Sequence, residues 1–409
     1  MECKWSQAPL GELISYISKG IVPKYTDDIV GSTIVLGQRC VRNQRVDYTQ
    51  ARFHDQKTKP FKPEKAVVLG DILINATGVG SAGRVAQVMA SPQQHCVTDG
   101  HVITLRAKGI NPFYLGYFLK SKQAMLEQMA EGSTGQTEMN RSRLQNEIVV
   151  TFPQDNAVQT AIAQFGLSVD RKIAINNQIN GYLEELLLAR YDELFGLFDS
   201  SACNGKLADI GEVIGGATPS KKRADYYSRD GIGWITPRDL SNTNKKFIAH
   251  GADDITQAGY DSCSARLLRK GSVLFSSRAP IGYVAIADDE LVTNQGFKSV
   301  VPKPEVGTAF VYCFLKRSAR RIADMGAGTT FPEVSGKMMK AVELKLPELE
   351  TCKSFSAFAK PLLHMQRKCE AENTELESLR DALLPRLMSG EIDVSKVGLT
   401  QLNSHLSGC

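Results

Sequence analysis

The sequence lacks a long hydrophobic run, a paired-cysteine motif and a histidine cluster. No stretch approaches the roughly 20 apolar residues that a bilayer span requires, so we expect no membrane-spanning segment. Its nine cysteines lie far apart and form no Cys-x-x-Cys pattern, which favours reduced thiols over zinc ligands or disulfides. The start of the chain mixes charged with apolar residues, unlike a secretory signal. We therefore expect a cytoplasmic protein without a metal site.

Motifs that carry catalysis are absent or incomplete. The six histidines include no His-Glu-x-x-His spacing, and neither a Gly-x-Ser-x-Gly elbow nor a phosphate loop occurs. Residues 78–83 (Gly-Val-Gly-Ser-Ala-Gly) match the dinucleotide-binding fingerprint. Residues 84–88, however, alternate like a strand where that fingerprint needs a helix. We predict a tight turn at this position and no cofactor bound by this chain.

Two further fragments resemble catalytic motifs. Residues 111–114 (Asn-Pro-Phe-Tyr) are similar to the Asn-Pro-Pro-aromatic motif of amino-methyltransferases, yet Asn followed by Pro is an ordinary helix start. Residues 343–345 (Glu-Leu-Lys) have the Glu-x-Lys spacing of metal-dependent nucleases but lack the preceding Pro-Asp. We expect a helix cap at the first site, a strand at the second, and no catalytic residue.

Short motifs of the first half of the chain recur in the same order in the second half. Each second copy lies between 194 and 201 residues after the first. The matched pairs are 70–74 (Gly-Asp-Ile-Leu-Ile) with 271–275 (Gly-Ser-Val-Leu-Phe), 97–99 (Val-Thr-Asp) with 292–294 (Val-Thr-Asn), 118–120 with 314–316 (both Phe-Leu-Lys), 132–134 (Gly-Ser-Thr) with 328–330 (Gly-Thr-Thr), and Pro153 with Pro347. Five ordered matches indicate an internal repeat.

The repeat sets the expected domain layout of a chain whose 409 residues exceed one usual domain. We expect a first domain (1–153), a central long helix (154–200), a second domain (201–347), a C-terminal long helix (348–392) and a tail (393–409). Within the repeats, β-branched runs predict strands and three- and four-residue apolar spacing predicts helices. The expected strands are 67–69, 71–74 and 102–105, and the expected helices are 114–130 and 310–325. The fold class is therefore mixed α/β.

Apolar side chains recur at steps of three and four after each repeat, over about 40 residues. This spacing predicts two coiled-coil-like rods, each about 60 Å long, packed as an antiparallel pair or on helices of a partner. A helix buried in one globular core is the alternative. Pro361 is expected to kink the second rod or mark its start, and Pro385 to bend its end. The expected packing positions are Ile162, Phe165, Val169, Leu183 and Leu186, and Leu376, Leu379, Leu383 and Leu387.

Two stretches of the chain carry a family resemblance. Residues 376–392 read Leu-x-x-Leu-Arg-Asp-Ala-Leu-Leu-Pro-Arg-Leu-Met-Ser-Gly-Glu-Ile. The second repeat opens with residues 207–211, 216–221 (Gly-Ala-Thr-Pro-Ser-Lys), 226–227 (Tyr-Tyr), 231–235 (Gly-Ile-Gly-Trp-Ile) and 239–240 (Asp-Leu). These stretches resemble the closing helix and the target-recognition domain of Type I restriction–modification specificity subunits. The first repeat lacks the Thr-Pro-Ser run and the tryptophan.

The resemblance implies a non-catalytic subunit that reads a bipartite, asymmetric site in double-stranded DNA, one half per repeat. It also implies that the long helices set the spacer and dock two methyltransferase subunits and the restriction subunits in a prokaryotic cytoplasm. S-adenosylmethionine is then expected in the partner methyltransferase. Three alternatives stay open: the recognition half of a two-gene system that cuts beside its site, a lone methyltransferase, and a coiled-coil scaffold that never contacts DNA.

Basic residues in loops of both repeats are the candidate DNA contacts. The net charge of +5 permits a nucleic-acid partner without requiring one, so local clusters must decide. Lysines there would neutralise phosphates, whereas Arg238 and Arg278 could donate two hydrogen bonds to a guanine edge. A solvated charged face is the alternative. The candidates are Arg42, Arg45, Arg84, Lys221, Lys222, Arg223, Arg238, Lys245, Lys246 and Arg278.

Overall fold

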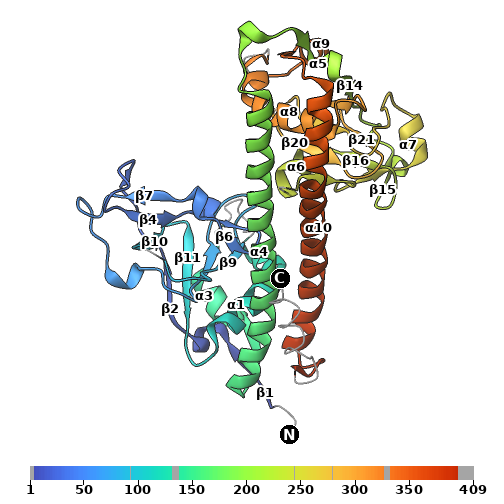
Figure 1. The fold of residues 1–409 in the computed structure, drawn as a ribbon. Helices are drawn as coiled ribbons and strands as arrows, with labels where there is room; N and C mark the ends of the chain where they lie inside the picture. Colours follow the sequence, from blue (N-terminus) through green and yellow to red (C-terminus); the bar gives the residue numbers. More distant parts are fainter. Residues whose placement is uncertain are drawn as a thin grey trace. The chain divides into compact units, whose positions relative to one another are not determined.

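The fold was obtained as a computed structural model, which describes residues 4–92, 94–130, 138–243, 245–278, 280–326 and 332–394. Its contacts divide the chain into two compact units, residues 1–173 with 375–409, and residues 174–374. Each unit holds one mixed α/β domain together with a stretch of each of two long helices (Figure 1). The expected fold class is confirmed. The repeated motifs at 132–134 and 328–330 lie outside the described residues.

The described residues of the first domain form short strands, three α-helices and short 3-10 turns. Its elements are β1 (Trp5–Pro9), β2 (Ile14–Lys19), β3 (Tyr25–Thr26), β4 (Thr33–Leu36), β5 (Val41–Arg42), β6 (Arg45–Val46), β7 (Arg52–His54), β8 (Ile72–Asn75), β9 (Val85–Gln87), β10 (Cys96–Thr98), β11 (Val102–Ala107), α1 (Pro112–Ser121), α2 (Gln123–Ala130), α3 (Arg141–Glu147) and β12 (Val149–Pro153). The main sheet has the antiparallel order β2-β11-β8-β9. A second sheet contains the parallel pair β10·β4, and β1 pairs with β12.

The second domain repeats this plan with different loops. Its elements are β13 (Gly205–Lys206), α5 (Leu207–Ile210), β14 (Gly211–Gly215), β15 (Tyr227–Ser228), β16 (Gly233–Ile235), α6 (Pro237–Thr243), β17 (Phe247–Ile248), β18 (Asp254–Ile255), α7 (Gln257–Asp261), β19 (Val273–Phe275), β20 (Val284–Ala287), β21 (Leu291–Thr293), β22 (Lys298–Pro302), α8 (Thr308–Asp324), α9 (Gly336–Lys340) and β23 (Glu343–Leu344). The main sheet has the order β14-β22-β19-β20-β17, and β16 and β21 form a parallel pair. The first four strands match β2-β11-β8-β9, which confirms the internal repeat.

The structure extends the repeat to a loop that the sequence motifs missed. A Cβ added at Gly20 would lie 1.9 Å from the carbonyl oxygen of Thr98, and one added at Gly216 would lie 2.1 Å from that of Thr293. Both glycines therefore allow the same close approach of two backbones. Residues 20–23 (Gly-Ile-Val-Pro) thus correspond to 216–219 (Gly-Ala-Thr-Pro), although the two stretches share only glycine and proline.

Two of the expected elements are wrong in detail. Residues 67–69 are no strand, because the Asp71 carboxylate accepts a hydrogen bond from the Val68 amide and Gly70 adopts a φ of 86°, which together form a turn. The helix expected over 114–130 is divided into α1 and α2, with Lys122 as the C-cap of α1. In the second domain, α8 is a single helix at the place expected for 310–325.

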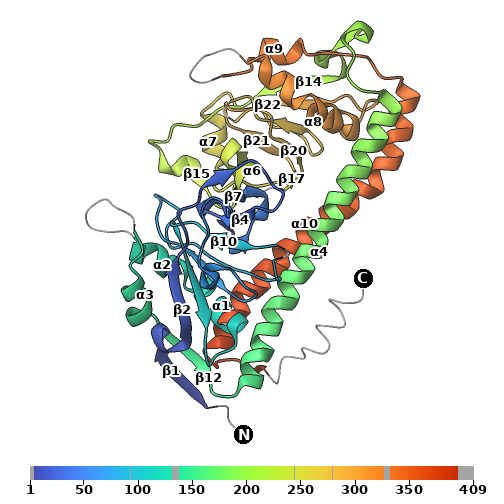
Figure 2. The same cartoon turned by 90° about the vertical axis from the view of Figure 1, so that its left-hand side faces the viewer.

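The two long helices are α4 (Asn156–Phe195) and α10 (Leu349–Met388), each of 40 residues (Figure 2). At 1.5 Å per residue, each is about 60 Å long. Pro361 and Pro385 lie inside α10, so the expectation that Pro361 marks its start is wrong. Among the described residues, no helix is long and apolar enough to cross a membrane.

The helices pack as an antiparallel pair within each unit. In the first unit Asp170 of α4 contacts Arg380 of α10, and in the second unit Asn180 contacts Gln366. The core of the first domain continues onto both helices, and so does that of the second. The helix residues in the first core include Ile162, Phe165, Val169, Leu376, Leu384 and Leu387, and those in the second include Leu187, Tyr191, Cys352, Phe355 and Ala359.

Two positions of the expected packing stripe are exposed and do not pack between the two helices. Leu186 is 49% exposed and Leu379 is 40% exposed, whereas Leu187 is fully buried. Helix geometry explains why Leu187 is buried and Leu186 is not, because successive residues of an α-helix are turned by about 100° around its axis. Relative to Ile162, Leu187 lies about 20° around the axis and Leu186 about 120°. Leu183 and Leu383 are partly buried.

Candidate nucleic-acid interface

The loop of residues 216–223, here called the lysine loop, is anchored to the second domain. The Trp234 indole Nε1 donates a hydrogen bond to the carbonyl oxygen of Ala217 at 3.0 Å. Trp234 is itself buried in β16, so the start of the loop is fixed to the sheet. Lys221 and Lys222 follow in the exposed part of the loop. The anchor thus presents two positive charges at a defined place.

Arg223 ends the lysine loop and is engaged locally. Its guanidinium pairs with the Asp225 carboxylate at 2.7 Å and lies over the Tyr226 ring, 4.8 Å from the centroid. The hydrogen bond from Arg223 lowers the pKa of Asp225. Both partners are exposed, and such pairs contribute little to stability, so a phosphate can compete for this guanidinium.

A glutamate holds two cations beside the lysine loop. Arg278 and Glu333 form a β-bridge through their backbones, and their side chains are paired at 3.0 Å. Lys298, the first residue of β22, lies 3.7 Å from the other oxygen of Glu333. The hydrogen bond from Arg278 lowers the pKa of Glu333, and the charges of Arg278 and Lys298 act in the same direction. Burial lowers the pKa of Lys298.

Further contacts join these loops into one surface. The Ser277 amide donates to the carbonyl oxygen of Gly296 at 2.7 Å, and Thr218 of the lysine loop hydrogen-bonds Gln295. A Cβ added at Gly296 would lie 2.9 Å from Pro237, so the exposed Arg238 is close to the same loops. We define the second loop surface as residues 216–223, 237–238, 277–278, 280–282, 294–298 and 332–334.

The first domain has a corresponding surface with different side chains. Glu138 forms a β-bridge with Thr77, as Glu333 does with Arg278, and it pairs with Lys19. The hydrogen bond from Lys19 lowers the pKa of Glu138. A hollow of about 470 Å³ is lined by Lys19, Glu138, Met139, Asn140, Arg141 and Ser142. We define the first loop surface as residues 19–24, 77–84, 99–101 and 138–142.

Arg84 belongs to this first loop surface, whereas other candidates do not. Its guanidinium donates to the carbonyl oxygen of Gly80 at 2.6 Å, within the glycine turn. The expected turn at 78–83 is confirmed, since Gly78, Gly80 and Gly83 have positive φ and a strand, β9, follows.

The structure places four candidates away from the loop surfaces. Lys246 is 8% exposed and hydrogen-bonds Gln366 of α10 at 2.6 Å, so its assignment as a DNA contact is wrong. Arg45 lies 3.9 Å from Asp170 of α4. Its neighbour Arg42 is exposed on the β5–β6 hairpin, and Lys245 hydrogen-bonds Thr374 of α10 at 2.9 Å. Sequence clustering does not reveal which face of a domain a cation occupies.

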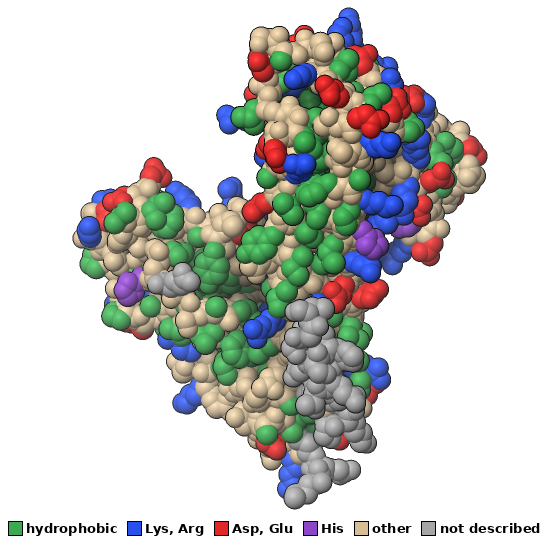
Figure 3. Space-filling model, in the orientation of Figure 1, with side chains coloured by type: hydrophobic (Ala, Val, Ile, Leu, Met, Phe, Trp, Pro, Cys, Tyr) green, Lys and Arg blue, Asp and Glu red, His purple; other side chains and the backbone are tan. Residues whose placement is uncertain are grey.

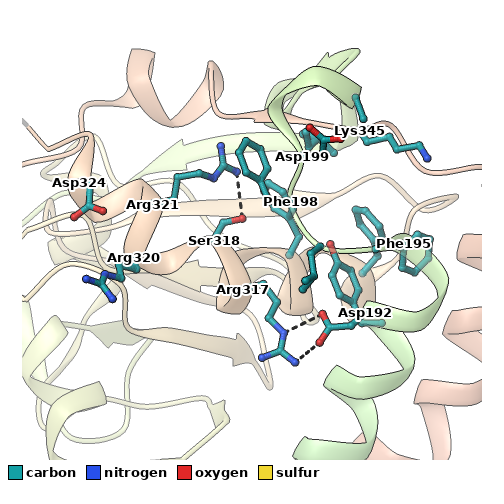
Figure 4. Close-up of a pocket in the computed structure, with 17 residues that line it drawn as sticks. Asp192, Phe195, Phe198, Asp199, Arg317, Ser318, Arg320, Arg321, Asp324 and Lys345 are labelled. Carbon is teal, nitrogen blue, oxygen red and sulfur yellow. Dashed lines mark hydrogen bonds and ion pairs between the residues drawn. The ribbon is translucent and has the colours of Figure 1, made fainter.

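Basic residues of α8 also form contacts within the second unit. A hollow of about 470 Å³ lies beside the end of α4, and Figure 4 shows the side chains that line it. In it, Arg317 pairs with Asp192 of α4, Nε to Oδ1 at 3.0 Å. Arg321 lies 3.7 Å from the centroid of the Phe198 ring and donates to Ser318. Two of its arginines therefore hold α8 against the end of α4.

The remaining partial motifs are structural. The Asn111 side chain accepts hydrogen bonds from the amides of Phe113 and Tyr114, at 3.0 and 3.1 Å, which confirms the expected helix cap. Glu343 and Leu344 form the strand β23, as expected.

Sequence reasoning missed Lys19, Lys298 and the two glutamates that hold the cations. Their signal was present in the repeat. Glu138 and Glu333 each follow a matched Gly-Ser/Thr-Thr motif by four or three residues, a correspondence that the isolated basic clusters did not use. Figure 3 shows that Lys and Arg side chains are interleaved with Asp and Glu over the face in view. Charge alone therefore does not delimit the interface.

Comparisons with known proteins agree with this architecture. The sequence matches the family described as Type I restriction modification DNA specificity domain twice, over residues 3–185 and 203–377. The MjaIX specificity subunit of Methanocaldococcus jannaschii is 45% identical over 147 residues, which span 36% of this chain and 34% of that relative. The HindI specificity subunit of Haemophilus influenzae is 23% identical, over 95% of this chain and 99% of the relative.

A solved structure shares the fold. The S subunit of the Type I restriction–modification system from M. genitalium superposes with a TM-score of 0.56 at 16% identity, covering 94% of this chain and 96% of that one. The two family matches each begin at a domain and end inside a long helix. The chain therefore belongs to the Type I restriction–modification DNA-specificity family, with one copy of the specificity domain in each half.

Proposed function

We propose that this chain is the non-catalytic subunit that gives a Type I restriction–modification complex its DNA specificity. Each domain contacts one half of a bipartite site in double-stranded DNA through its own loop surface. The observation that supports this most directly is the glutamate bridge at the same topological position in both repeats, Thr77 with Glu138 and Arg278 with Glu333. In both domains that glutamate holds a cation at the edge of the main sheet.

Within the second loop surface, lysine and arginine side chains make different kinds of contact with DNA. Lys221 and Lys222 neutralise phosphates, which adds affinity for every sequence. Arg278 has the planar donor fork that matches a guanine edge, and Glu333 fixes its orientation before DNA arrives. The first domain carries Thr77 at the position of Arg278. The two halves of the site therefore differ in sequence.

The long helices supply the assembly surface in this proposal. Leu186 and Leu379 project from the helices with roughly half their area exposed, although the other positions of the stripe are buried or partly buried. Exposed apolar residues on a helix are typical of surfaces that partner helices cover. We assign them to two methyltransferase subunits, with the restriction subunits joining the complex. S-adenosylmethionine binds in the methyltransferase, and this chain binds no cofactor.

The helices also set the spacer between the half-sites. Four residues inserted between positions 186 and 190 lengthen α4 by about 6 Å and turn the following segment by about 40°. We expect the unread spacer to grow by one to two base pairs, at about 3.4 Å per base pair, while both half-sites keep their sequences. Sequencing of methylated positions measures the change, and an unchanged spacer contradicts this role.

DNA binding by the assembled complex tests the loop surface. Replacing Lys221 and Lys222 with alanine should weaken binding to all sequences alike and reduce the slope of log affinity against log salt by about two. The matched control is Lys303→Ala, because Lys303 is exposed just beyond the opposite end of β22 from Lys298. Fluorescence anisotropy over a salt series gives both quantities. Equal slopes of log affinity against log salt for the double variant and the control would show that the lysine loop does not contact DNA.

A further inference from the structure

His101 of the first loop surface has a structural counterpart in the second domain. The Ala76 amide donates a hydrogen bond to the carbonyl oxygen of His101 at 2.7 Å. In the second domain the Ser277 amide donates to the carbonyl oxygen of Gly296, also at 2.7 Å. His101 and Gly296 therefore occupy the same place in the two domains.

The turn that carries these two residues is held in the same way in both domains. The Asp99 carboxylate accepts a hydrogen bond from the His101 amide at 2.9 Å, and the Asn294 side chain accepts one from the Gly296 amide at 2.9 Å. Asp99 is buried, whereas the His101 side chain is exposed. The turn thus fixes the backbone of His101 and presents its ring at the surface.

Side-chain size at this place is exchanged between two neighbouring positions. The first domain combines Thr77 with His101, whereas the second combines Arg278 with Gly296, which has no side chain. Each domain therefore presents one planar side chain with nitrogen donors here. That side chain comes from the turn between β10 and β11 in the first domain, and from the segment after β19 in the second.

Hydrogen bonds determine which ring nitrogen of His101 carries the hydrogen. The carbonyl oxygen of Thr77 can only accept, so the Gln38 side chain turns its amide nitrogen toward it, at 2.8 Å. The same nitrogen donates to the Thr77 hydroxyl oxygen at 2.5 Å. The Thr77 hydroxyl is then the donor to Nδ1 of His101, 2.9 Å away. Because Nδ1 accepts, a neutral imidazole carries its hydrogen on Nε2.

We propose that His101 reads a base of the first half-site, with its Nε2–H group as the donor to an acceptor atom on the base edge. This inference rests on the proposed function and names the counterpart of Arg278 in the first domain. Guanine and thymine present such acceptors, whereas the exocyclic amine of cytosine is itself a donor. Thr77 and Gln38 are positioning residues, because they hold the ring and set its tautomer.

Binding by the complex assembled with the natural methyltransferase tests this assignment. Sequencing of methylated positions gives the natural site, and the probes are duplexes in which each base pair of both half-sites is replaced in turn. His101→Ala should lose roughly tenfold in discrimination at one base pair of the first half-site. Discrimination in the second half-site should not change, and neither should the salt dependence, because a neutral side chain releases no counterion.

The matched control is His95→Ala. His95 is also exposed and directly precedes β10, whereas His101 lies beyond the other end of that strand. We expect this variant to bind every duplex as the natural complex does. A loss of discrimination in both variants would overturn the assignment of base reading to His101.

Two variants of Thr77 test the positioning role. Thr77→Val keeps the shape of the side chain but removes the hydroxyl, whereas Thr77→Ser keeps the hydroxyl. ¹⁵N NMR of the imidazole nitrogens at about pH 8, with His101→Ala identifying the signals, should show the hydrogen on Nε2 in the natural chain and in Thr77→Ser. In Thr77→Val it should be shared between both nitrogens, and discrimination at the same base pair should fall. A hydrogen on Nδ1 in the natural chain overturns the assignment.

The binding results separate this inference from the proposed function. Equal binding of the natural complex to all duplexes would contradict the proposed function itself. If the natural complex discriminates in both half-sites and His101→Ala keeps that discrimination, only the role of His101 is overturned. A loss of affinity that is equal for all duplexes also overturns that role, because it is the result that a phosphate contact would give.

Discussion

The two domains share a scaffold but differ in how their loops are held. In the second domain Trp234 of β16 anchors the lysine loop through its indole nitrogen. In the first domain Val35 occupies the corresponding place, because it pairs with Val97 of β10 as Trp234 pairs with Val292 of β21. Valine offers no donor to the loop of residues 20–24. Four strands of the main sheet nevertheless keep the same order in both domains, β2-β11-β8-β9 in the first and β14-β22-β19-β20 in the second.

This difference shows which parts of the domain are free to change. The glycine that lets the loop approach the parallel pair is kept in both domains, at Gly20 and Gly216, since any Cβ there would collide with a carbonyl oxygen. The side chains beyond it are not constrained by the core. A shared scaffold with independent loops is what two readers of different half-sites require.

The largest expected effect separates two adjacent lysines of the second domain. Lys246→Ala should lower the free energy of unfolding by about 3–5 kcal/mol, because it leaves Glu184 buried without its cation. Lys245→Ala should cost less than about 0.5 kcal/mol, because its partner Thr374 is exposed and neutral. Urea denaturation measures both. Similar losses for the two variants would mean that the buried pair does not attach the domain to the helices.

A smaller effect distinguishes the matched lysines of the two Phe-Leu-Lys motifs. Lys120 is buried, which lowers its pKa to about 8, whereas Lys316 is exposed. Between pH 8 and 10 the unfolded chain keeps a proton that folded Lys120 releases, so this lysine makes stability rise with pH. Its share is about 1 kcal/mol per pH unit. Lys246, whose pKa burial also lowers, adds to the rise in any chain that keeps this lysine.

Denaturation at several pH values isolates the contribution of Lys120 to the pH dependence of stability. Lys120→Met should reduce the slope of stability against pH between 8 and 10 by about 1 kcal/mol per unit. Lys316→Met should leave the slope of the natural chain unchanged. A slope unaffected by Lys120→Met would show that the lysine is not buried as a cation beside Asp170.

The smallest expected effect concerns the loop anchor. Trp234→Phe keeps an aromatic ring in the sheet but removes the donor to Ala217, so we expect a stability loss of about 1 kcal/mol. The second loop surface should lose order, and the first should be unaffected. Amide exchange at residues 216–223 and at residues 20–24 provides the comparison. Faster exchange in both loops would show that the effect is not local.

The repeat, the long helices and the fold class could be predicted from the sequence because they depend on patterns that span many residues. Five ordered motifs locate the two domains, and steps of three and four locate α4 and α10. Residues 67–69 show the limit of such reasoning. Two of the three are β-branched valines, which suit a strand, but a single hydrogen bond from the Val68 amide to Asp71 makes a turn.

The candidate interface was predictable only in part, because tertiary position decides which cations face outward. Lys221, Lys222 and Arg278 lie on the second loop surface, while Lys246 from a similar lysine cluster is buried against α4 and α10. Leu186 and Leu187 show the same limit on α4. They are adjacent in the sequence, yet the Leu186 side chain is exposed and the Leu187 side chain is buried. Composition and local clustering do not show which side of a helix or domain faces the core.

An exchange of one recognition domain shows whether each domain reads its own half-site. Residues 203–347 are replaced by the corresponding domain of the Haemophilus influenzae relative, and the chimaera is expressed with the natural methyltransferase. Sequencing of methylated bases across the host genome then reads both half-sites at once. We expect one half of the methylated sequence to change while the other half stays the same. A change in both halves, or in neither, would contradict it.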